Sequence, residues 1–148
     1  MVKVLALDFD GVVVNSLPVR DAGFQYAFSH YGKIKSELAK KLHIAHRGVY
    51  RLDKFKLIFN NVIGINPSKN DVDFVEKKFL FYVESKKNLI SFFPGADMLS
   101  TLEDVSICII SALPHTEVED FLSKKRMLHL FDEILGGPYK KSNHLKNI

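Results

Sequence analysis

Continuous apolar runs and helically spaced apolar positions alternate along this chain. Val2 to Leu7 is apolar apart from Lys3, and Val105 to Ile110 is a second apolar run that ends at Ser111. Phe131 to Leu135 is a shorter third segment, with Asp132 and Glu133 between its apolar residues. Short apolar runs of this kind are typical of strands buried on both faces of a parallel sheet. The pattern therefore predicts three strands.

The segment between the first two runs has a helical pattern. A helix is predicted from Pro18 to about His30, and a later one begins at a capping box formed by Ser68 and Asp71. Gly64 is predicted to end the helix that precedes this box. The apolar positions at helical spacing are Leu52, Phe55, Phe59 and Val62 in one helix and Val72, Val75, Phe79 and Val83 in the next. We therefore expect an all-helical unit with its own packed interior.

The remaining chain returns to alternating helices and strands. Pro94-Gly95 breaks the chain before a short helix, and Thr116 with Glu119 predicts a capping box for a longer one. A turn at 136–138 follows the third strand, and another helix begins after it. The order predicts an α/β core, a Rossmann-like parallel sheet interrupted after its first strand by a helical insertion.

Composition and charge exclude several classes of protein. The 148 residues are 47% hydrophobic and 26% charged, which indicates a globular chain with one domain or a compact core with an insertion. The net charge of +4 comes from scattered lysines without interleaved aromatic residues, so no nucleic-acid partner is expected. The apolar runs are far shorter than the roughly 20 residues of a membrane helix, so no membrane partner is expected.

The N-terminus and the cysteine content indicate a cytoplasmic protein. No apolar segment with a small-residue cleavage site precedes the first strand, so no signal peptide is predicted. Cys108 is the single cysteine and lies within an apolar run, which predicts a buried thiol.

Polar residues follow each predicted strand at its carboxyl end. Asp8 and Asp10 follow the first strand, Ser111 the second, and Lys140 and Lys141 the third. Ligands of open parallel sheets bind outside the carboxyl ends of the strands, so these groups are expected to face one crevice. Two carboxylates, a hydroxyl and an ammonium group around one point suit phosphoryl transfer.

Each of these groups has a physical role in that reaction. A carboxylate attacks phosphorus and forms an acyl-phosphate, and a second carboxylic acid protonates the leaving oxygen and then activates water. Mg²⁺ offsets the repulsion between carboxylate and phosphate, and it prefers oxygen ligands. A hydroxyl and a lysine hold the other phosphate oxygens.

The segment Asp8-Phe9-Asp10-Gly11-Val12, with Asn15-Ser16 after it, resembles the first motif of the haloacid dehalogenase (HAD) superfamily. The resemblance implies that Asp8 is the nucleophile and that Asp10 is the general acid and base. It also implies that the Asp8 carboxylate and the Asp10 backbone carbonyl bind Mg²⁺. An acid at Asp10 resembles the phosphatases and phosphomutases of this superfamily.

Two later segments resemble the second and third motifs. The run Ile109-Ile110-Ser111-Ala112 resembles the second motif, which implies phosphate binding at Ser111 and Ala112. The segment from Gly136 to Lys141 is similar to the third-motif region of phosphoglycolate-phosphatase-like members. Its spacing favours Lys141 as the phosphate-anchoring lysine, with Lys140 as the alternative.

The insertion resembles the helical cap of the superfamily's first cap class. The expected division is a core of residues 1–16 and 92–148 and a cap of residues 17–91. Within the cap, Arg51 and Lys54 are candidates for binding the substrate as an anion, and a solvated helix face is the alternative interpretation.

The three histidines His43, His46 and His115 fit no zinc pattern, so surface or helix-cap roles are expected for them. His115 follows Ser111 closely enough to be a candidate for touching substrate.

Members of the superfamily continue into a fourth strand and an acidic loop that completes the Mg²⁺ site, and nothing follows Ile148 here. The chain is therefore expected to be incomplete at its C-terminus, to lack the fourth motif and to be slow or inactive by itself. The first strand would then be an exposed apolar edge, through which a homodimer could form.

The resemblance implies a Mg²⁺-dependent phosphatase that hydrolyses a small phosphomonoester through a phospho-aspartate intermediate. Its partner would be a small phosphorylated metabolite. Two alternatives stay open: a phosphomutase with the same motifs, and a degenerate, non-enzymatic HAD fold that serves in binding or assembly.

Overall fold

The computed structural model describes residues 3–138 and 141–144. The chain forms two compact units. The sheet unit comprises Met1–Asn15 and Ser91–Ile148, and the helical unit comprises Ser16–Ile90. These boundaries lie one residue from the division that the sequence predicts.

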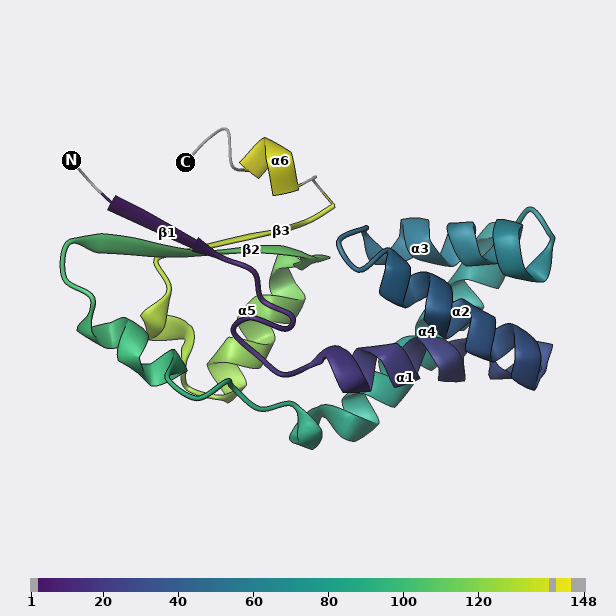
Figure 1. Cartoon of the computed structure of the whole chain (residues 1–148), viewed down its shortest axis with the longest axis horizontal. Helices are drawn as coiled ribbons and strands as arrows, with labels where there is room; N and C mark the ends of the chain where they lie inside the picture. The colour runs from purple at the N-terminus through teal and green to yellow at the C-terminus, as the bar shows by residue number, and fades with distance from the viewer. Residues whose placement is uncertain (1–2, 139–140, 145–148) are drawn as a thin grey trace. The chain divides into compact units, whose positions relative to one another are not determined.

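The sheet unit contains three parallel strands, β1 (Lys3–Leu7), β2 (Val105–Pro114) and β3 (Glu133–Gly137), in the order β1-β2-β3 (Figure 1). The register of the first pair runs from Lys3 opposite Val105 to Leu7 opposite Ile109. The predicted parallel α/β sheet is confirmed.

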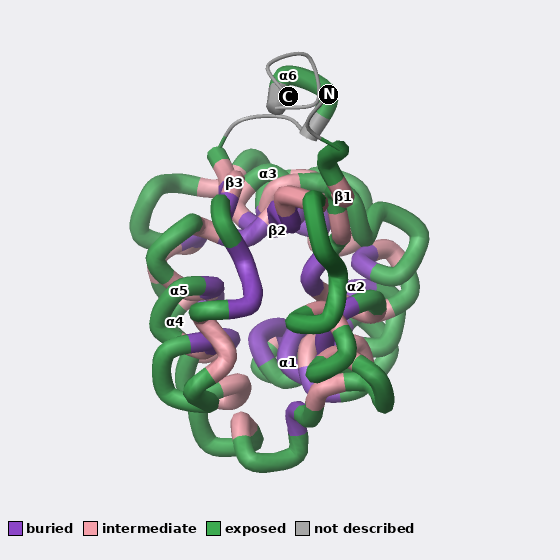
Figure 2. Tube along the Cα trace, turned by 90° about the vertical axis from the view of Figure 1, so that its left-hand side faces the viewer, coloured by how far each residue is buried: buried purple, intermediate pink, exposed green. Residues whose placement is uncertain are grey.

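The two apolar strands β1 and β2 differ in burial. Five consecutive residues of β2 are buried, from Ile107 to Ser111, whereas Val4 of β1 is 42% exposed and Lys3 and Ala6 are exposed too (Figure 2). The prediction that the first strand is buried on both faces is wrong. Its position at the edge of the described sheet leaves it with β2 as its one neighbouring strand.

Short helices connect the strands of the sheet unit. The segment after Pro94-Gly95 is a 3₁₀ helix, η4 (Ala96–Thr101), and α5 (His115–Lys124), η5 (Leu128–Leu130) and α6 (Lys141–His144) follow. The predicted capping box at Thr116 and Glu119 is wrong, because α5 begins at His115 with Pro114 in the N-cap position. Thr116 therefore lies inside the first turn.

Hydrogen bonds tie β2 to the segment that precedes β3. The Asp132 carboxylate accepts hydrogen bonds from the Ile107 N–H at 2.7 Å and from the Ser106 hydroxyl at 3.1 Å. The Asp132 carboxylate therefore stabilises the sheet by bonding to β2. Cys108 is buried as predicted, and burial raises the pKa of its thiol.

The helical unit packs four α-helices around aromatic side chains. Its ten-residue core includes Phe24, whose ring centroid lies 5.1 Å from that of Phe55 and 5.0 Å from that of Phe79. The expected packed interior is therefore present. In chain order the elements are α1 (Leu17–Ala27), η1 (Ser29–Tyr31), α2 (Lys33–Ala45), α3 (Arg51–Ile58), the π-helical turn η2 (Phe59–Ile63), α4 (Lys69–Lys86) and η3 (Lys87–Leu89).

Two predicted helix ends in this unit are confirmed. Ser68 and Asp71 form the capping box that opens α4, with the Asp71 N–H donating to the Ser68 hydroxyl at 3.2 Å and the Ser68 N–H donating to the Asp71 carboxylate at 2.8 Å. Gly64 ends the preceding turn in the left-handed conformation, with φ 85°. Within residues 3–138 and 141–144, none of the helices has the length and apolar character needed to cross a membrane.

Candidate active site

The carboxyl ends of β1 and β2 bring the first two motifs to the same end of the sheet. Leu7, the last residue of β1, lies opposite Ile109, and Asp8 follows it directly. Ser111 lies two residues further along β2 than Ile109 and is 1% exposed. The parallel register therefore places Asp8 and Ser111 at the carboxyl end of the strands, where open parallel sheets bind ligands.

A tightly hydrogen-bonded loop fixes the backbone around the two aspartates. The Phe9 carbonyl accepts from the N–H groups of Val13 at 3.0 Å and Val14 at 3.1 Å, and the Gly11 N–H donates to the Val14 carbonyl at 2.8 Å. Gly11 has φ 80°, a conformation that costs glycine little and other residues more. The loop is thus closed on itself immediately after Asp10.

Burial anchors the residue between the two carboxylates. Phe9 is 1% exposed and meets Phe121 edge-on, with ring centroids 5.7 Å apart. Asp8 on one side of Phe9 is exposed and Asp10 on the other is half-buried. The alternation of acidic and apolar residues therefore buries the Phe9 ring in the core. The carboxylates of Asp8 and Asp10 on either side of it are more accessible to solvent.

The loop is also tied to the segment that re-enters the sheet unit. The Asn15 N–H donates to the Ser91 carbonyl at 2.8 Å, and the Phe93 N–H donates to the Val13 carbonyl at 3.1 Å. These two bonds flank the antiparallel bridge between Val14 and Phe92. The loop that carries Asp8 and Asp10 is therefore held by its own hydrogen bonds and by the segment 91–93.

Local hydrogen bonds orient Asp8 and Ser111. One carboxylate oxygen of Asp8 accepts from the Phe9 N–H at 2.7 Å, and the Ser111 hydroxyl oxygen accepts from the Leu113 N–H at 3.1 Å. A hydroxyl that accepts through its oxygen retains its O–H for donation to an anion. Ala112, the other phosphate candidate of this motif, is half-buried beside Ser111.

The end of β3 packs against the start of α5 through a glycine. A side chain at Gly136 would bring a Cβ atom within 2.4 Å of the His115 backbone nitrogen and within 2.7 Å of the Leu113 carbonyl oxygen. Nδ1 of His115 donates to the Ile134 carbonyl at 2.8 Å, and its Nε2 lies 3.4 Å from the Glu119 carboxylate. His115 is therefore anchored to β3, and its contact with substrate stays a prediction.

The lysines of the third motif lie at the limit of the described chain. Lys140 lies outside the described residues. Lys141 opens α6, and its side chain is likewise outside the described part of the structure. The choice between the two lysines therefore stays open.

Arg51 and Lys54 are buried within the helical unit. Arg51 is 7% exposed, and its Nε and Nη2 donate to the Glu76 carboxylate at 3.3 and 3.1 Å. Lys54 is 5% exposed, and its ammonium group lies 3.2 Å from Nδ1 of His43 and over the Phe24 ring. The interpretation of both as a solvated helix face is therefore wrong, and their contact with substrate stays a prediction.

His43 departs most from expectation. The predicted surface or cap role is wrong, because His43 is 4% exposed and stacks on Phe24 with ring centroids 3.8 Å apart. Its Nε2 lies 3.2 Å from the carboxylate of Asp21, a buried acid of α1. Burial, together with nearby cations, lowers the pKa of His43 to about 3. Asp21 lies among the apolar positions of the helix predicted from Pro18, and this was the one feature of the sequence that could have indicated a buried partner for His43.

The donor set at the loop suits Mg²⁺ in kind. Asp8 and Asp10 offer oxygen atoms, and Mg²⁺ is commonly held by one or two carboxylates with several waters retained. In the part of the chain that the structure describes, no three His, Cys, Asp or Glu side chains are grouped as in a closed metal cage. The carboxylate oxygen atoms of Asp8 and Asp10 are donors of the kind that Mg²⁺ prefers.

Comparison with known proteins gives fold relatives only. No protein-family model matches this chain, and no curated protein matches it. A predicted phosphoglycolate phosphatase from Haemophilus somnus 129PT is similar, with a TM-score of 0.70 and 19% identity over 93% of this chain and 63% of that one. A haloacid dehalogenase-like hydrolase from Streptococcus pneumoniae has a TM-score of 0.67 and 19% identity over 98% of this chain and 68% of that one.

A predicted phosphatase from Clostridium acetobutylicum is similar to the same degree, with a TM-score of 0.67 and 17% identity over 93% of this chain. This chain spans between 62% and 68% of the length of these three structures. Identities this low establish architecture rather than activity. The chain has the fold of the HAD-like hydrolases.

Proposed function

We propose that this chain belongs to a Mg²⁺-dependent phosphatase that hydrolyses a small phosphomonoester through a phospho-aspartate at Asp8. The observation that carries the proposal is the closed loop after β1, which holds Asp8 and Asp10 at the same sheet end as the buried Ser111. The HAD-like fold supports it, because several solved proteins of this fold are described as phosphatases.

In the proposed reaction, a carboxylate oxygen of Asp8 attacks phosphorus as the bond to the ester oxygen breaks. Asp10 donates its proton to that leaving oxygen, which departs as an alcohol. Asp10, now a carboxylate, takes a proton from water as the water attacks the acyl-phosphate, and this step restores Asp8 and releases phosphate.

Ser111 and one of the two lysines hold the phosphate oxygens in this proposal. The Ser111 hydroxyl donates to an oxygen of the phosphoryl group, and Lys141 or Lys140 adds a positive charge. The Asp8 carboxylate and the Asp10 backbone carbonyl would hold Mg²⁺. When bound, Mg²⁺ reduces the repulsion between the carboxylate and the incoming phosphate.

The test is an assay of the whole gene product with p-nitrophenyl phosphate and Mg²⁺. Asp8→Asn removes the nucleophile, so we expect activity to fall by about 10³-fold or more. Asp53→Asn is the matched control, because Asp53 is an exposed acid of α3 in the helical unit, and it should leave turnover unchanged. Equal turnover by Asp8→Asn and the unchanged protein would refute the proposal.

A phosphomutase is the second candidate. A proposed beta-phosphoglucomutase from Thermotoga maritima has the same fold, with a TM-score of 0.59 and 15% identity over 91% of this chain and 61% of that one. A mutase would exchange phosphate between two positions of one sugar with little net release. Measuring free phosphate and sugar-phosphate isomers in one reaction separates the two enzymes, and a protein inactive in both would favour the binding or assembly alternative.

A further inference from the structure

A hollow of about 450 Å³ lies in the surface of the sheet unit where α5 ends, and we call it the α5 hollow. Four residues line it: Ser123, Arg126, Leu128 and His129. Their side chains bring a hydroxyl, a guanidinium group and an imidazole around one apolar group. Small-molecule sites of roughly 300–1,000 Å³ combine apolar contact with a few convergent polar groups, so the α5 hollow has the size and the chemistry of a binding site.

The α5 hollow lies away from the active-site loop. α5 begins directly after β2, and η5 lies between α5 and β3 (Figure 1). Because β2 and β3 are parallel, α5 returns the chain from the carboxyl end of β2 to the amino end of β3. The end of α5 is therefore at the amino ends of the strands, whereas Asp8 and Ser111 are at the carboxyl ends.

Arg126 has an unusual backbone conformation at this end of α5. Its N–H donates to the Ser123 carbonyl at 3.0 Å, and the Met127 N–H donates to the Leu122 carbonyl at 2.9 Å. These two bonds form a Schellman motif, in which the residue after the C-cap is left-handed, and Arg126 accordingly has φ 58°. Glycine is the usual residue at this position, because other residues are strained there. The chain therefore has an arginine where glycine would relieve strain.

The side chain of Arg126 has donors available for a ligand. Within residues 3–138 and 141–144, neither the Arg126 guanidinium nor the His129 imidazole has a hydrogen-bond or ion-pair partner, and both residues are exposed. A guanidinium group has five N–H donors in a planar fork that matches two oxygen atoms of a carboxylate or a phosphate. Strained residues are frequent at ligand sites, so the backbone and the side chain of Arg126 indicate the same role.

We propose that the α5 hollow binds a small organic anion, with Arg126 holding its carboxylate or phosphate group and Leu128 contacting its apolar part. The Ser123 hydroxyl and an N–H of the His129 imidazole donate further hydrogen bonds to the anion. This ligand is distinct from the phosphomonoester at Asp8, because the two sites lie at opposite ends of the strands. The proposal does not depend on Asp8 as a nucleophile.

NMR of the full chain tests the proposal, with inorganic phosphate and benzoate added in separate titrations. We expect a saturable shift of the Arg126 Nε–H signal with at least one anion, and a shift of the Leu128 methyl signals wherever benzoate binds. The two titrations distinguish a site for phosphate groups from a site for carboxylates. Phosphate bound near Ser111 would leave both signals unchanged. If neither anion moves the Arg126 signal, the proposal is wrong.

Two replacements of Arg126 separate binding from a structural role. Arg126→Gln removes the charge and keeps the strain, so it should bind the anion about tenfold more weakly or worse. Arg126→Gly should bind as weakly and also raise the midpoint of urea unfolding, because glycine favours this conformation. Cations at a helix C-terminus also stabilise the helix macrodipole. If that were the role of Arg126, both variants would lower the midpoint and bind the anion normally.

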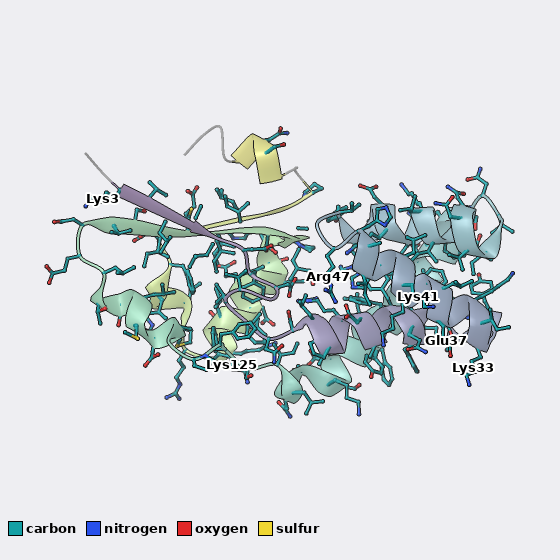
Figure 3. The ribbon with its side chains drawn as sticks, in the orientation of Figure 1. Lys3, Lys33, Glu37, Lys41, Arg47 and Lys125 are labelled. Carbon is teal, nitrogen blue, oxygen red and sulfur yellow. The ribbon has the colours of Figure 1, made fainter. Side chains whose placement is uncertain are left out.

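Lys125→Gln is the matched control, because it removes the same charge from the neighbouring residue. Lys125, which is labelled in Figure 3, does not line the α5 hollow, and its ammonium group lies 5.9 Å from the centroid of the Phe121 ring. This variant should bind both anions as the unchanged protein does. Equal weakening by Lys125→Gln and Arg126→Gln would show that general positive charge attracts the anion, and it would overturn the proposal.

Discussion

Single residues in this protein are constrained by partners that lie far away along the chain. Asp21 and His43 are separated by 22 positions, and Gly136 is required by the backbone of His115 and Leu113. In each case a buried residue is in close contact with a distant part of the chain. Replacing His43 or Gly136 should therefore change the stability of the fold in a predictable direction.

His43 makes the protein sensitive to acid. Its pKa is about 3 in the folded chain and about 6.5 in the unfolded chain, so only the unfolded chain takes up this proton between those values. Stability is therefore full above about pH 6.5 and falls as pH is lowered towards about 3. From about pH 7 to about pH 5 the loss attributable to His43 should be about 2 kcal/mol.

Urea unfolding at the two pH values measures this loss. His43→Gln cannot take up the proton, so its stability should change less over the same range. His46→Gln replaces an exposed histidine of the same segment and should keep the full pH dependence. An identical acid response in His43→Gln and the unchanged protein would contradict the assignment.

Gly136→Ala should destabilise the sheet unit. The added Cβ would lie 2.4 and 2.6 Å from backbone atoms of His115 and 2.7 Å from the Leu113 carbonyl, and backbone atoms cannot move aside as a flexible side chain can. We expect a loss of about 3 kcal/mol in the free energy of unfolding, measured in urea. Gly48→Ala, where no atom lies within 4 Å of the added Cβ, should cost far less.

At the scale of elements, the two predicted capping boxes give a direct comparison. Ser68 caps α4 through its hydroxyl, and hydrogen bonds first from this hydroxyl and then from the Ser68 amide hold the pKa of Asp71 below its usual value. Ser68→Ala should cost about 1 kcal/mol of stability and return the pKa of Asp71 towards its ordinary range. Thr116→Ala should cost less, because α5 begins without a side-chain cap. Urea unfolding measures the loss of stability in each variant, and NMR titration measures the pKa of Asp71. Equal losses of stability in the two variants would show that the Ser68 cap does not stabilise α4.

The elements could be predicted from sequence where a local pattern determines them. The three strands, the Ser68 cap and the placing of Asp8 and Ser111 at strand ends all follow from short apolar runs and the residues beside them. For β1 the apolar run predicted burial on both faces, which is wrong, whereas the expected edge position agrees with the order of the described sheet. The contact between Asp21 and His43 could not be predicted, because two polar residues 22 positions apart leave no periodic pattern in the sequence.

At the scale of the whole molecule, β1 has one edge without a neighbouring strand in the described sheet. In the described sheet it pairs with β2 on one side, and its other edge presents backbone N–H and C=O groups beside the exposed Val4. Exposed apolar edge strands favour pairing with another strand. A second copy of this chain offers such a strand, and two β1 edges related by a two-fold axis would pair antiparallel.

Self-association through this edge is therefore our proposal for the isolated chain, and Val4→Lys tests it. A charge at the exposed edge opposes strand pairing, so the variant should stay monomeric at concentrations where the unchanged chain dimerises, as measured by sedimentation velocity. Ile34→Lys makes the same apolar-to-charged change at a residue of the helical unit that is 75% exposed, and it should not alter association. A chain that is monomeric at every concentration would contradict the proposal, and equal dissociation by both variants would place the contact elsewhere.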